Sequence, residues 1–384
     1  MKSLIPSWRD SLSLTFAGTR HQFLGTQCTP EHFSVCLSEL VTLSGSGHAG
    51  DGVLRLFVAV SDQRQLNEIN GQLASDFATL VSRTEVVIQP PLLGQVQISA
   101  WRIEPSSTTS KVSESKTNGL EWHFSASNLY DVSDTHLLTS YTRQFYGCLA
   151  DSKERGHSVD DLLRTWIYIG SITHGPHDET RYQIVNAARK DVFRELRLGA
   201  GEGKSRFPAS TGIGTQGSSI NLGFLSCRIN ATNEYRAVAL ENRRQTSAFH
   251  YPKEESLVAP LFSRAVAILG AAEAMVFVSG TASIIGVKSI HLSSIEQQTR
   301  QTIDNISNLL CARLLSDYDS YPVTTGLDSI VCYTVYLKHR DDFAAVRDIC
   351  ESRLPERAIA TYVEADVCRS ELLVEIEATA VMPG

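Results

Sequence analysis

An order of strands and helices that occurs twice is the feature that most restricts how this chain of 384 residues can fold. In the first copy, hydrophobic spacing predicts strands and helices in alternation: strands at 121–127, 163–169 and 220–229, and helices at 134–149 and 182–196. In the second copy the same order returns: strands at 275–285, 329–337 and 372–380, and helices at 295–315 and 341–354. The chain is therefore predicted to contain an internal repeat of one α+β unit of about 100 residues.

A polar stretch rich in serine and threonine, residues 106–119, precedes the repeat and predicts a linker. Residues 1–105 contain short strand patterns and a helical pattern at 65–83, so we expect an N-terminal α/β extension. The two repeat units then occupy 120–255 and 256–384. The predicted fold class is α+β: two tandem units packed side by side, each a mixed sheet covered by helices, with the extension on a face that a third unit would otherwise occupy.

Composition and charge argue against several classes of protein. A net charge of −7 gives no basic footprint for nucleic acid. No run approaches the roughly 18 apolar residues of a membrane span, and Pro6, Arg9 and Asp10 interrupt the start too early for a secretory signal. The eight cysteines form no Cys-x-x-Cys pair, which argues against a zinc site or a disulfide framework. We expect a cytoplasmic protein with neither a membrane nor a nucleic-acid partner.

Two carboxylates stand in the apolar strand that closes the chain. Residues 372, 374, 376 and 378 are apolar and share one face, whereas Glu375 and Glu377 lie on the other. A solvated sheet face explains this pattern, and so does a cleft. In a cleft, burial without a partner would raise the pKa of a carboxyl group and make it a proton donor near neutral pH. The pattern alone leaves both interpretations open.

The second copy resembles the reactive-intermediate deaminase (Rid/YjgF) family in four pieces: 278–283, 298–306, 334–337 and 374–378. The first copy carries related pieces at 163–169, 181–182, 186–189 and 208–214. The resemblance implies a mixed sheet packed by two helices, in an assembly that normally trimerises and leaves clefts between neighbouring subunits. Two fused copies would form such a cleft within one chain.

Residues 120–384 also resemble the chorismatases, which cleave chorismate to pyruvate and a ring acid. The similar stretches follow one another in the family's order: 210–217, 241–252, 279–283 and 365–375. Two positions depart from the family's pattern. Arg243 stands where we expect a proline, and Val287-Lys288 stands where the family tends to have a histidine. The resemblance implies an enzyme without a cofactor.

The chemistry of chorismate sets what its site must contain. Chorismate is a dianion, and cleavage of its enolpyruvyl ether requires protonation of the methylene carbon to give an oxocarbenium ion. The site therefore needs one protonated acid, donors for two carboxylates and exclusion of most water. Glu375 matches the family's acid, whereas the matching stretch of the first copy, 220–226, contains no acid. We expect one competent cleft built around Glu375, with Glu377 in a structural role.

Two further positions bear on the product. In the family, a cysteine matching Cys368 occurs in members that make 3-hydroxybenzoate, and its role there is to help a strained ring intermediate to aromatise. An alanine matching Ala282 accompanies hydrolysis to the dihydroxy-cyclohexadiene carboxylate. These two residues favour different products, and a mixture of 3- and 4-hydroxybenzoate is a further outcome. We favour 3-hydroxybenzoate.

Several residues are candidate ligands for the substrate's carboxylates and hydroxyl. Arg244 and Gln245 are favoured, because a guanidinium fork suits a carboxylate and an amide can donate to a ring hydroxyl. The weaker candidates are Tyr251, Arg206, Arg369 and the backbone of Gly214, although its glycine-rich stretch could equally be a tight turn. A dinucleotide site is disfavoured, because we expect no parallel strand–helix–strand unit around these glycines. His174 and His177 lack a third ligand at metal spacing, so no metal is expected.

Three functions remain open at this point, in a monomer or weak homo-oligomer. The first is chorismate cleavage. The second is a Rid-type imine deaminase, whose carboxylate-binding arginine follows a Pro-Ala pair; here Ser210 follows Pro208-Ala209, and Thr361 stands in the second copy. The third is a non-catalytic binding protein. A chorismate assay separates them, because only the first releases pyruvate.

Overall fold

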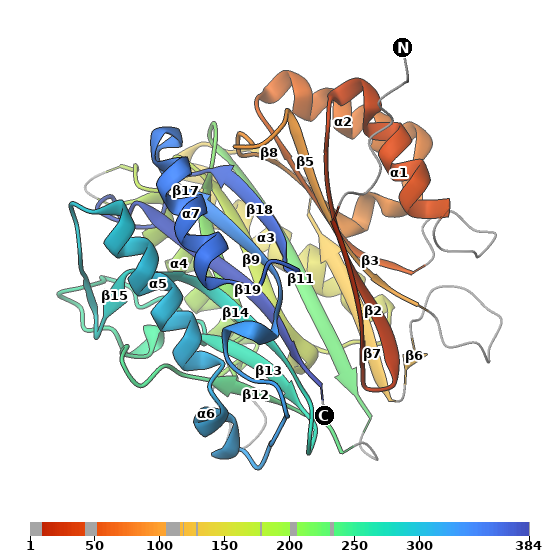
Figure 1. Ribbon diagram of the computed structural model, residues 1–384. Helices are drawn as coiled ribbons and strands as arrows, with labels where there is room; N and C mark the ends of the chain where they lie inside the picture. The colour runs from red at the N-terminus through yellow and green to blue at the C-terminus, as the bar shows by residue number, and fades with distance from the viewer. Residues whose placement is uncertain are drawn as a thin grey trace.

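Three mixed sheets with helices on their outer faces make up the computed structural model (Figure 1). The structure describes residues 10–42, 52–104, 116–117, 119–127, 130–176, 179–199, 206–230 and 234–383. Within these residues, no helix is long and apolar enough to cross a membrane. Most of the predicted linker, residues 106–115 and 118, lies outside the described residues.

The N-terminal sheet has the strand order β1-β2-β5-β3-β4. Its elements are β1 (Asp10–Phe16), β2 (Thr19–Cys28), α1 (Phe33–Thr42), β3 (Val53–Val60), α2 (Gln63–Asp76), β4 (Thr84–Ile88) and β5 (Val96–Ile103). Asp62 caps α2 by accepting a hydrogen bond from the Gln65 N–H. The helix predicted at 65–83 stops at Asp76, because Phe77 leaves the helical region (φ −137°), and a 3-10 helix follows over Ala78–Arg83.

The middle sheet has the order β10-β9-β11-β7-β6, with β8 paired to β11. Its elements are β6 (Lys116–Thr117), β7 (Leu120–Ala126), β8 (Tyr130–Asp131), α3 (Asp134–Glu154), β9 (Leu162–Gly170), α4 (Arg181–Glu195), β10 (Ala209–Thr215) and β11 (Ser219–Ile229). Thr180 and Gln183 form a capping box that starts α4. Strands β9 and β10 are parallel, so α4 completes a parallel strand–helix–strand unit. The expectation that none exists was wrong. The glycines of 208–217 mostly lie within β10 and do not form the turn that leads into the helix.

The C-terminal sheet has the order β12-β13-β14-β19-β17-β18, and β15 and β16 form a separate hairpin. Its strands are β12 (Arg236–Leu240), β13 (Ala265–Leu269), β14 (Ala274–Ala282), β15 (Ile284–Ile285), β16 (Lys288–Ser289), β17 (Ile330–Leu337), β18 (Ile359–Glu364) and β19 (Val374–Met382). Its helices are α5 (Ile295–Leu309), α6 (Ala312–Ser316) and α7 (Phe343–Arg353). Ser294 caps α5 through the Gln297 N–H.

Five strands of each sheet share one order, to which the C-terminal sheet adds β12. Each sheet has one parallel pair: β3 with β4, β9 with β10, and β17 with β18. The N-terminal extension is thus a third copy of the repeated unit, which the sequence pattern did not reveal. The predicted pair of units is in contact through β10 and β14, and the N-terminal sheet occupies the third position, touching β18 through β2 and β11 through β4. The three units close into a ring within one chain.

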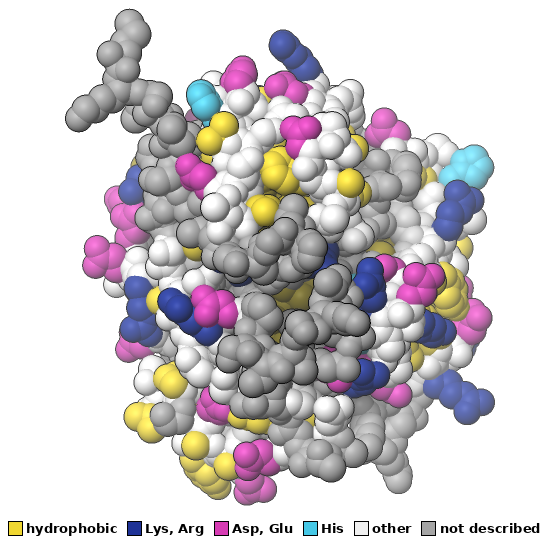
Figure 2. Space-filling view, turned by 90° about the vertical axis from the view of Figure 1, so that its right-hand side faces the viewer, with side chains coloured by type: hydrophobic (Ala, Val, Ile, Leu, Met, Phe, Trp, Pro, Cys, Tyr) yellow, Lys and Arg dark blue, Asp and Glu magenta, His cyan; other side chains and the backbone are white. Residues whose placement is uncertain are grey.

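The inner faces of the sheets meet in a shared core, whereas each outer face packs its own helices. One aromatic ring from each sheet lies at the centre of this shared core. The centroids of Trp101 and Trp122 lie 5.3 Å apart, and Phe277 lies 5.9 and 6.1 Å from them. Such edge and tilted contacts favour a single packing arrangement of the three sheets. On the face shown in Figure 2, described basic and acidic side chains are interspersed.

Candidate active site

A cavity of about 360 Å³ lies where the middle sheet meets the C-terminal sheet. Its walls come from α4 and β10 on one side, from β14 and β19 on the other, and from the loops around 251–264 and 368–372. This volume falls in the range of small-molecule sites in proteins. The cavity is therefore the cleft between repeat units that the sequence predicted.

Glu375 lies in the wall of this cavity on β19. Its register neighbours are Ala282 in β14 and Tyr336 in β17, and its exposed fraction is 4%. Burial, and then the negative charge of Glu377, raise the pKa of Glu375 to about 8. Gly280 leaves room for the carboxyl group, since a Cβ there would lie 2.0 Å from Glu375 Oε1. Glu375 is thus a protonated carboxylic acid at neutral pH.

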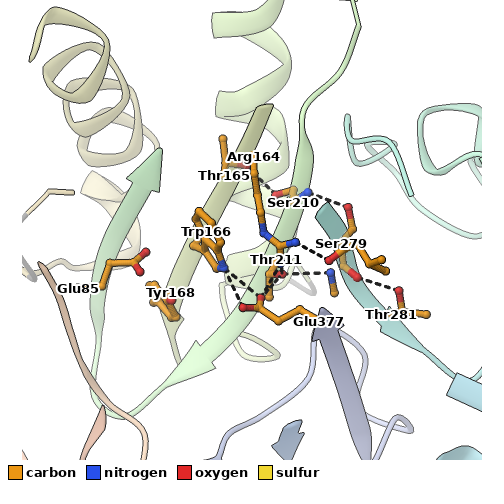
Figure 3. A network of polar contacts seen from close by, with 12 residues as sticks. Glu85, Arg164, Thr165, Trp166, Tyr168, Ser210, Thr211, Ser279, Thr281 and Glu377 are labelled. Atoms are coloured by element: carbon orange, nitrogen blue, oxygen red, sulfur yellow. Dashed lines mark hydrogen bonds and ion pairs between the residues drawn. The ribbon is translucent and has the colours of Figure 1, made fainter. Parts of the chain in front are cut away.

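Glu377 is on the same face of β19 but is held in a polar network (Figure 3). Arg164 Nη2 donates to its Oε2 at 2.9 Å, Trp166 Nε1 donates at 3.0 Å and Thr211 Oγ1 donates at 2.5 Å. Burial alone would raise the pKa of Glu377, but Arg164 and Arg55, with the hydrogen bonds, hold it below its usual value. Glu377 is therefore an anion beside the protonated Glu375.

Arg55 of the N-terminal sheet packs against this network. The Arg55 guanidinium lies 3.7 Å from the centroid of the Trp166 ring and forms an ion pair with Glu85 at 2.6 Å. Because Arg55 also helps to keep Glu377 ionised, the third unit contributes to the electrostatics of a cavity that it does not line.

Four of the residues selected from the sequence join Glu375 at the cavity: Cys368, Ala282, Tyr251 and Arg369. Burial, and then the proximity of Glu375, raise the pKa of Cys368 to about 12, so the group is a neutral thiol. Arg369 Nη1 donates to Val287 O at 3.0 Å and to Ser289 Oγ at 3.2 Å.

Four other candidates lie outside the cavity lining. Arg244 is exposed, and Gln245 is buried with its Nε2 donating to Ile284 O at 3.1 Å. The Gly214 N–H donates to Asp366 O at 2.8 Å, so it is engaged within the protein. Arg206 donates to Asp160 O and Leu162 O, at 3.4 and 3.3 Å. The polar groups of Gln245, Gly214 and Arg206 are thus engaged within the protein.

Two arginines that line the cavity were not selected from the sequence: Arg264 and Arg189. Arg264 Nη2 donates to Tyr251 Oη at 2.7 Å and to Thr246 O at 2.9 Å. A sequence signal existed for both. Arg264 directly precedes the apolar strand β13, and Arg189 falls on the inward face of α4 between Val185 and Val192.

The other two sheets carry amides at the position of Glu375. Across its sheet Glu375 pairs with Tyr336, Asn221 pairs with Tyr168, and Gln97 pairs with Ala59. The first repeat unit thus has no acid here, as predicted.

At the interface of the N-terminal and C-terminal sheets, the Gln97 amide forms hydrogen bonds between the two sheets. Its Nε2 donates to Ala360 O at 3.2 Å, and its Oε1 accepts from the Tyr362 N–H at 3.3 Å. The amide is used to join two sheets and is not aimed at a cavity.

Within the described residues, no group of three or more His, Cys, Asp or Glu side chains is arranged to hold a metal ion. His174 is exposed, and His177 lies outside the described part of the chain.

Comparisons with known proteins agree with this geometry. Residues 100–226 match the family model "Chorismatase FkbO/Hyg5-like, N-terminal", and residues 255–382 match "Endoribonuclease L-PSP". A 3-hydroxybenzoate synthase of Streptomyces hygroscopicus is 34% identical over 64% of this chain and 71% of its own length. A chorismatase of Streptomyces rapamycinicus is 31% identical over 56% of this chain and 63% of its own length.

A crystal structure of a chorismatase shares the fold, with a TM-score of 0.67 at 23% identity over 87% of this chain and 95% of that one. The sequence match to the Streptomyces hygroscopicus protein covers more than two thirds of that relative at 34% identity. This chain belongs to the chorismatase family.

Proposed function

We propose that this protein cleaves chorismate to pyruvate and 3-hydroxybenzoate, with Glu375 as the general acid. The observation that carries the proposal is a buried carboxylic acid, with its pKa raised to about 8, in a cavity lined by three arginines. The names of two relatives, a 3-hydroxybenzoate synthase and a chorismatase, support the same substrate and product.

The first step is proton transfer from the Glu375 carboxyl group to the methylene carbon of the enolpyruvyl ether. A protonated acid with a pKa near the working pH is suited to this transfer, because it is both populated and able to give up its proton. The resulting oxocarbenium ion is attacked by the ring's own hydroxyl group. A bond forms between the hydroxyl oxygen and the pyruvyl carbon, and the hydroxyl proton returns to Glu375. The bond between this oxygen and the ring then breaks while the ether oxygen moves from the pyruvyl carbon to the vacated ring carbon, which releases pyruvate and leaves a strained ring epoxide. The epoxide opens with transfer of a ring proton to its oxygen, so that pyruvate and 3-hydroxybenzoate together contain all the atoms of chorismate and no water is consumed.

Arg264 is the cavity arginine best placed for the enolpyruvyl carboxylate. The methylene carbon and this carboxylate are bonded to the same carbon, so whatever holds the carboxylate must lie close to Glu375. Among the cations that oppose the burial of Glu375, Arg264 has the largest effect on its pKa. The hydrogen bonds from Arg264 to Tyr251 and Thr246 hold its guanidinium in place.

Cys368 acts on the ring as a neutral thiol. With a pKa of about 12 the thiol is protonated at neutral pH, so it serves as a weak donor and a polarisable neighbour rather than as a thiolate base. Ala282 lies opposite Glu375 in β14 and sets how closely the ring approaches the acid.

The test is incubation of the protein with chorismate, followed by pyruvate measurement and chromatography of the ring acids. Glu375→Gln should reduce pyruvate release by about 100-fold or more, because the amide has nearly the same shape but cannot donate a proton to carbon. Glu351→Gln, on the exposed surface of α7, is the matched control and should retain parental turnover. Release of ammonia from imines without pyruvate from chorismate would contradict the proposal.

A further inference from the structure

The inner face of α4 buries two arginines with different surroundings. Arg181 donates to Val132 O at 3.1 Å and to Ser218 O at 2.5 Å, and it also forms an ion pair with Asp134. Arg189, two turns later on the same helix, is 1% exposed, and its Nε and Nη2 atoms have no hydrogen-bond partner. Arg181 is thus satisfied by the protein, whereas Arg189 is not.

Arg189 is unusual among the buried arginines of the described structure, which are Arg102, Arg164, Arg181, Arg189 and Arg264. The other four donate to protein oxygens. In the part of the chain that the structure describes, no hydrogen bond or ion pair satisfies Arg189; its guanidinium lies 5.2 Å from the centroid of the Phe193 ring.

A buried cation without a counter-ion is expensive, because the protein interior does not replace the hydration that the charge has lost. The ionisable neighbours that act on Arg189 are the phenols Tyr141 and Tyr182, and burial raises the pKa of both, which keeps them neutral. Arg189 also lines the cavity. An anionic ligand in the cavity would supply the missing negative charge.

Chorismate has a second carboxylate, on its ring, away from the reacting ether. If Arg264 holds the enolpyruvyl carboxylate beside Glu375, the ring carboxylate points toward another wall. The α4 wall offers Arg189 and, next to it, the Tyr182 ring, which packs so closely on β10 that a Cβ at Gly212 would lie 2.8 Å from Tyr182 Cε2. A flat side chain beside a cation suits an unsaturated ring that carries a carboxylate.

We propose that Arg189 is the specificity-determining residue that binds the ring carboxylate of the substrate, and of the 3-hydroxybenzoate product. This inference rests on the proposed function for the identity of the ligand. It divides the carboxylates between two walls of the cavity, with Arg264 at the reacting end and Arg189 at the ring end. The site is therefore selective for six-membered unsaturated rings that bear a carboxylate.

The test compares binding of 3-hydroxybenzoate with that of 3-hydroxybenzamide, its neutral analogue, by titration calorimetry. The parental protein should prefer the acid by about 10- to 100-fold, the range for hydrogen bonds to a charged group. Arg189→Gln should reduce this preference to about twofold or less. Arg264→Gln, at the other wall, and Arg194→Gln, at an exposed position of α4, should keep it.

An unchanged preference in Arg189→Gln, or no preference in the parental protein, would overturn the assignment. Thermal melting checks that each variant is folded. If Arg189→Gln does not fold, Arg189→Lys decides: lysine retains the charge but not the planar fork, so the acid preference should fall and should not stay at the parental value. The binding measurement requires no turnover. Absence of pyruvate release from chorismate would therefore refute the proposed function alone, whereas an unchanged acid preference would refute only the role of Arg189.

Discussion

Glu375 and Glu377 lie two residues apart on one face of β19, and the protein holds them in opposite protonation states. Burial and the charge of Glu377 raise the pKa of Glu375 to about 8. At Glu377, the effect of burial is outweighed by Arg164 and Arg55, which hold its pKa below the usual value. The negative charge of Glu377 raises the pKa of Glu375 and so keeps Glu375 neutral. Two side chains of the same type therefore have different protonation states and different roles.

The raised pKa of Glu375 predicts the pH dependence of turnover. The reaction needs the protonated acid, so kcat/KM for pyruvate release should be level below pH 8 and fall above it with the slope of one proton, since kcat/KM reports groups of the free enzyme. A midpoint near pH 8 is expected from the pKa of about 8. A profile that falls with a midpoint near 4.5, the ordinary value for glutamate, would show that the pKa of the catalytic acid is not raised.

Removing the negative charge of Glu377 should shift the pH profile of kcat/KM. In Glu377→Gln the charge that raises the pKa of Glu375 is lost, so the alkaline limb should shift to lower pH. The variant should also lose about 3 to 5 kcal/mol in the free energy of unfolding, because Arg164 is left buried without its counter-ion.

Thr211→Val is the matched control, since it removes one hydrogen bond to Glu377 but keeps the charge. Its alkaline limb should move less than that of Glu377→Gln. Equal shifts in the two variants would indicate that the hydrogen-bond network, and not the charge of Glu377, sets the acidity of Glu375.

Gly280→Ala should displace the acid without unfolding the protein. The new Cβ would lie 2.0 Å from Glu375 Oε1, and the end of a side chain can move where a backbone cannot. We expect at least a tenfold loss of kcat, about 1.4 kcal/mol in the barrier, with little change in melting temperature. Gly147→Ala, within α3 where a Cβ meets no atom within 4 Å, should leave kcat unchanged. Parental kcat in Gly280→Ala would show that the position of the carboxyl group is not critical.

Cys368→Ala should change the ring product while pyruvate is still released. The thiol has a pKa of about 12, so the loss removes a weak donor and a polarisable contact, not a base. A tenfold change in partition needs only about 1.4 kcal/mol between two transition states. Chromatography should show less 3-hydroxybenzoate and more dihydroxy-cyclohexadiene carboxylate. An unchanged product ratio would mean that Cys368 contributes only packing.

The closing strand and its acid could be predicted from the sequence because the relevant information is local. Alternation over 372–380 defines the two faces of the strand, and the resemblance identifies Glu375. For the two arginines proposed as carboxylate ligands, the local patterns show at most an inward position and not that both side chains reach one cavity. Arg264 and Arg189 approach one cavity from different units, and nothing near Arg244 in the sequence shows that its loop turns the side chain to solvent.

The third unit escaped prediction for a related reason. Its strand order is that of the other two units, but the residues that meet at its interfaces differ. Where β19 has Glu375, β5 has Gln97, which joins two sheets through backbone groups. Hydrophobic alternation specifies strands but not their order in a sheet, so the same architecture arises from sequences with few residues in common.

The closed ring of three linked units has a genetic consequence. In an assembly of three identical chains, one codon determines the same position at every interface, so a residue that helps chemistry at one interface is imposed on the other two. Here the positions of Gln97, Asn221 and Glu375 have separate codons. One interface can keep the buried acid Glu375, although burial of an ionisable group lowers stability. Another interface uses the amide of Gln97 to hydrogen-bond two sheets together. Linking the units has made their interfaces independently mutable.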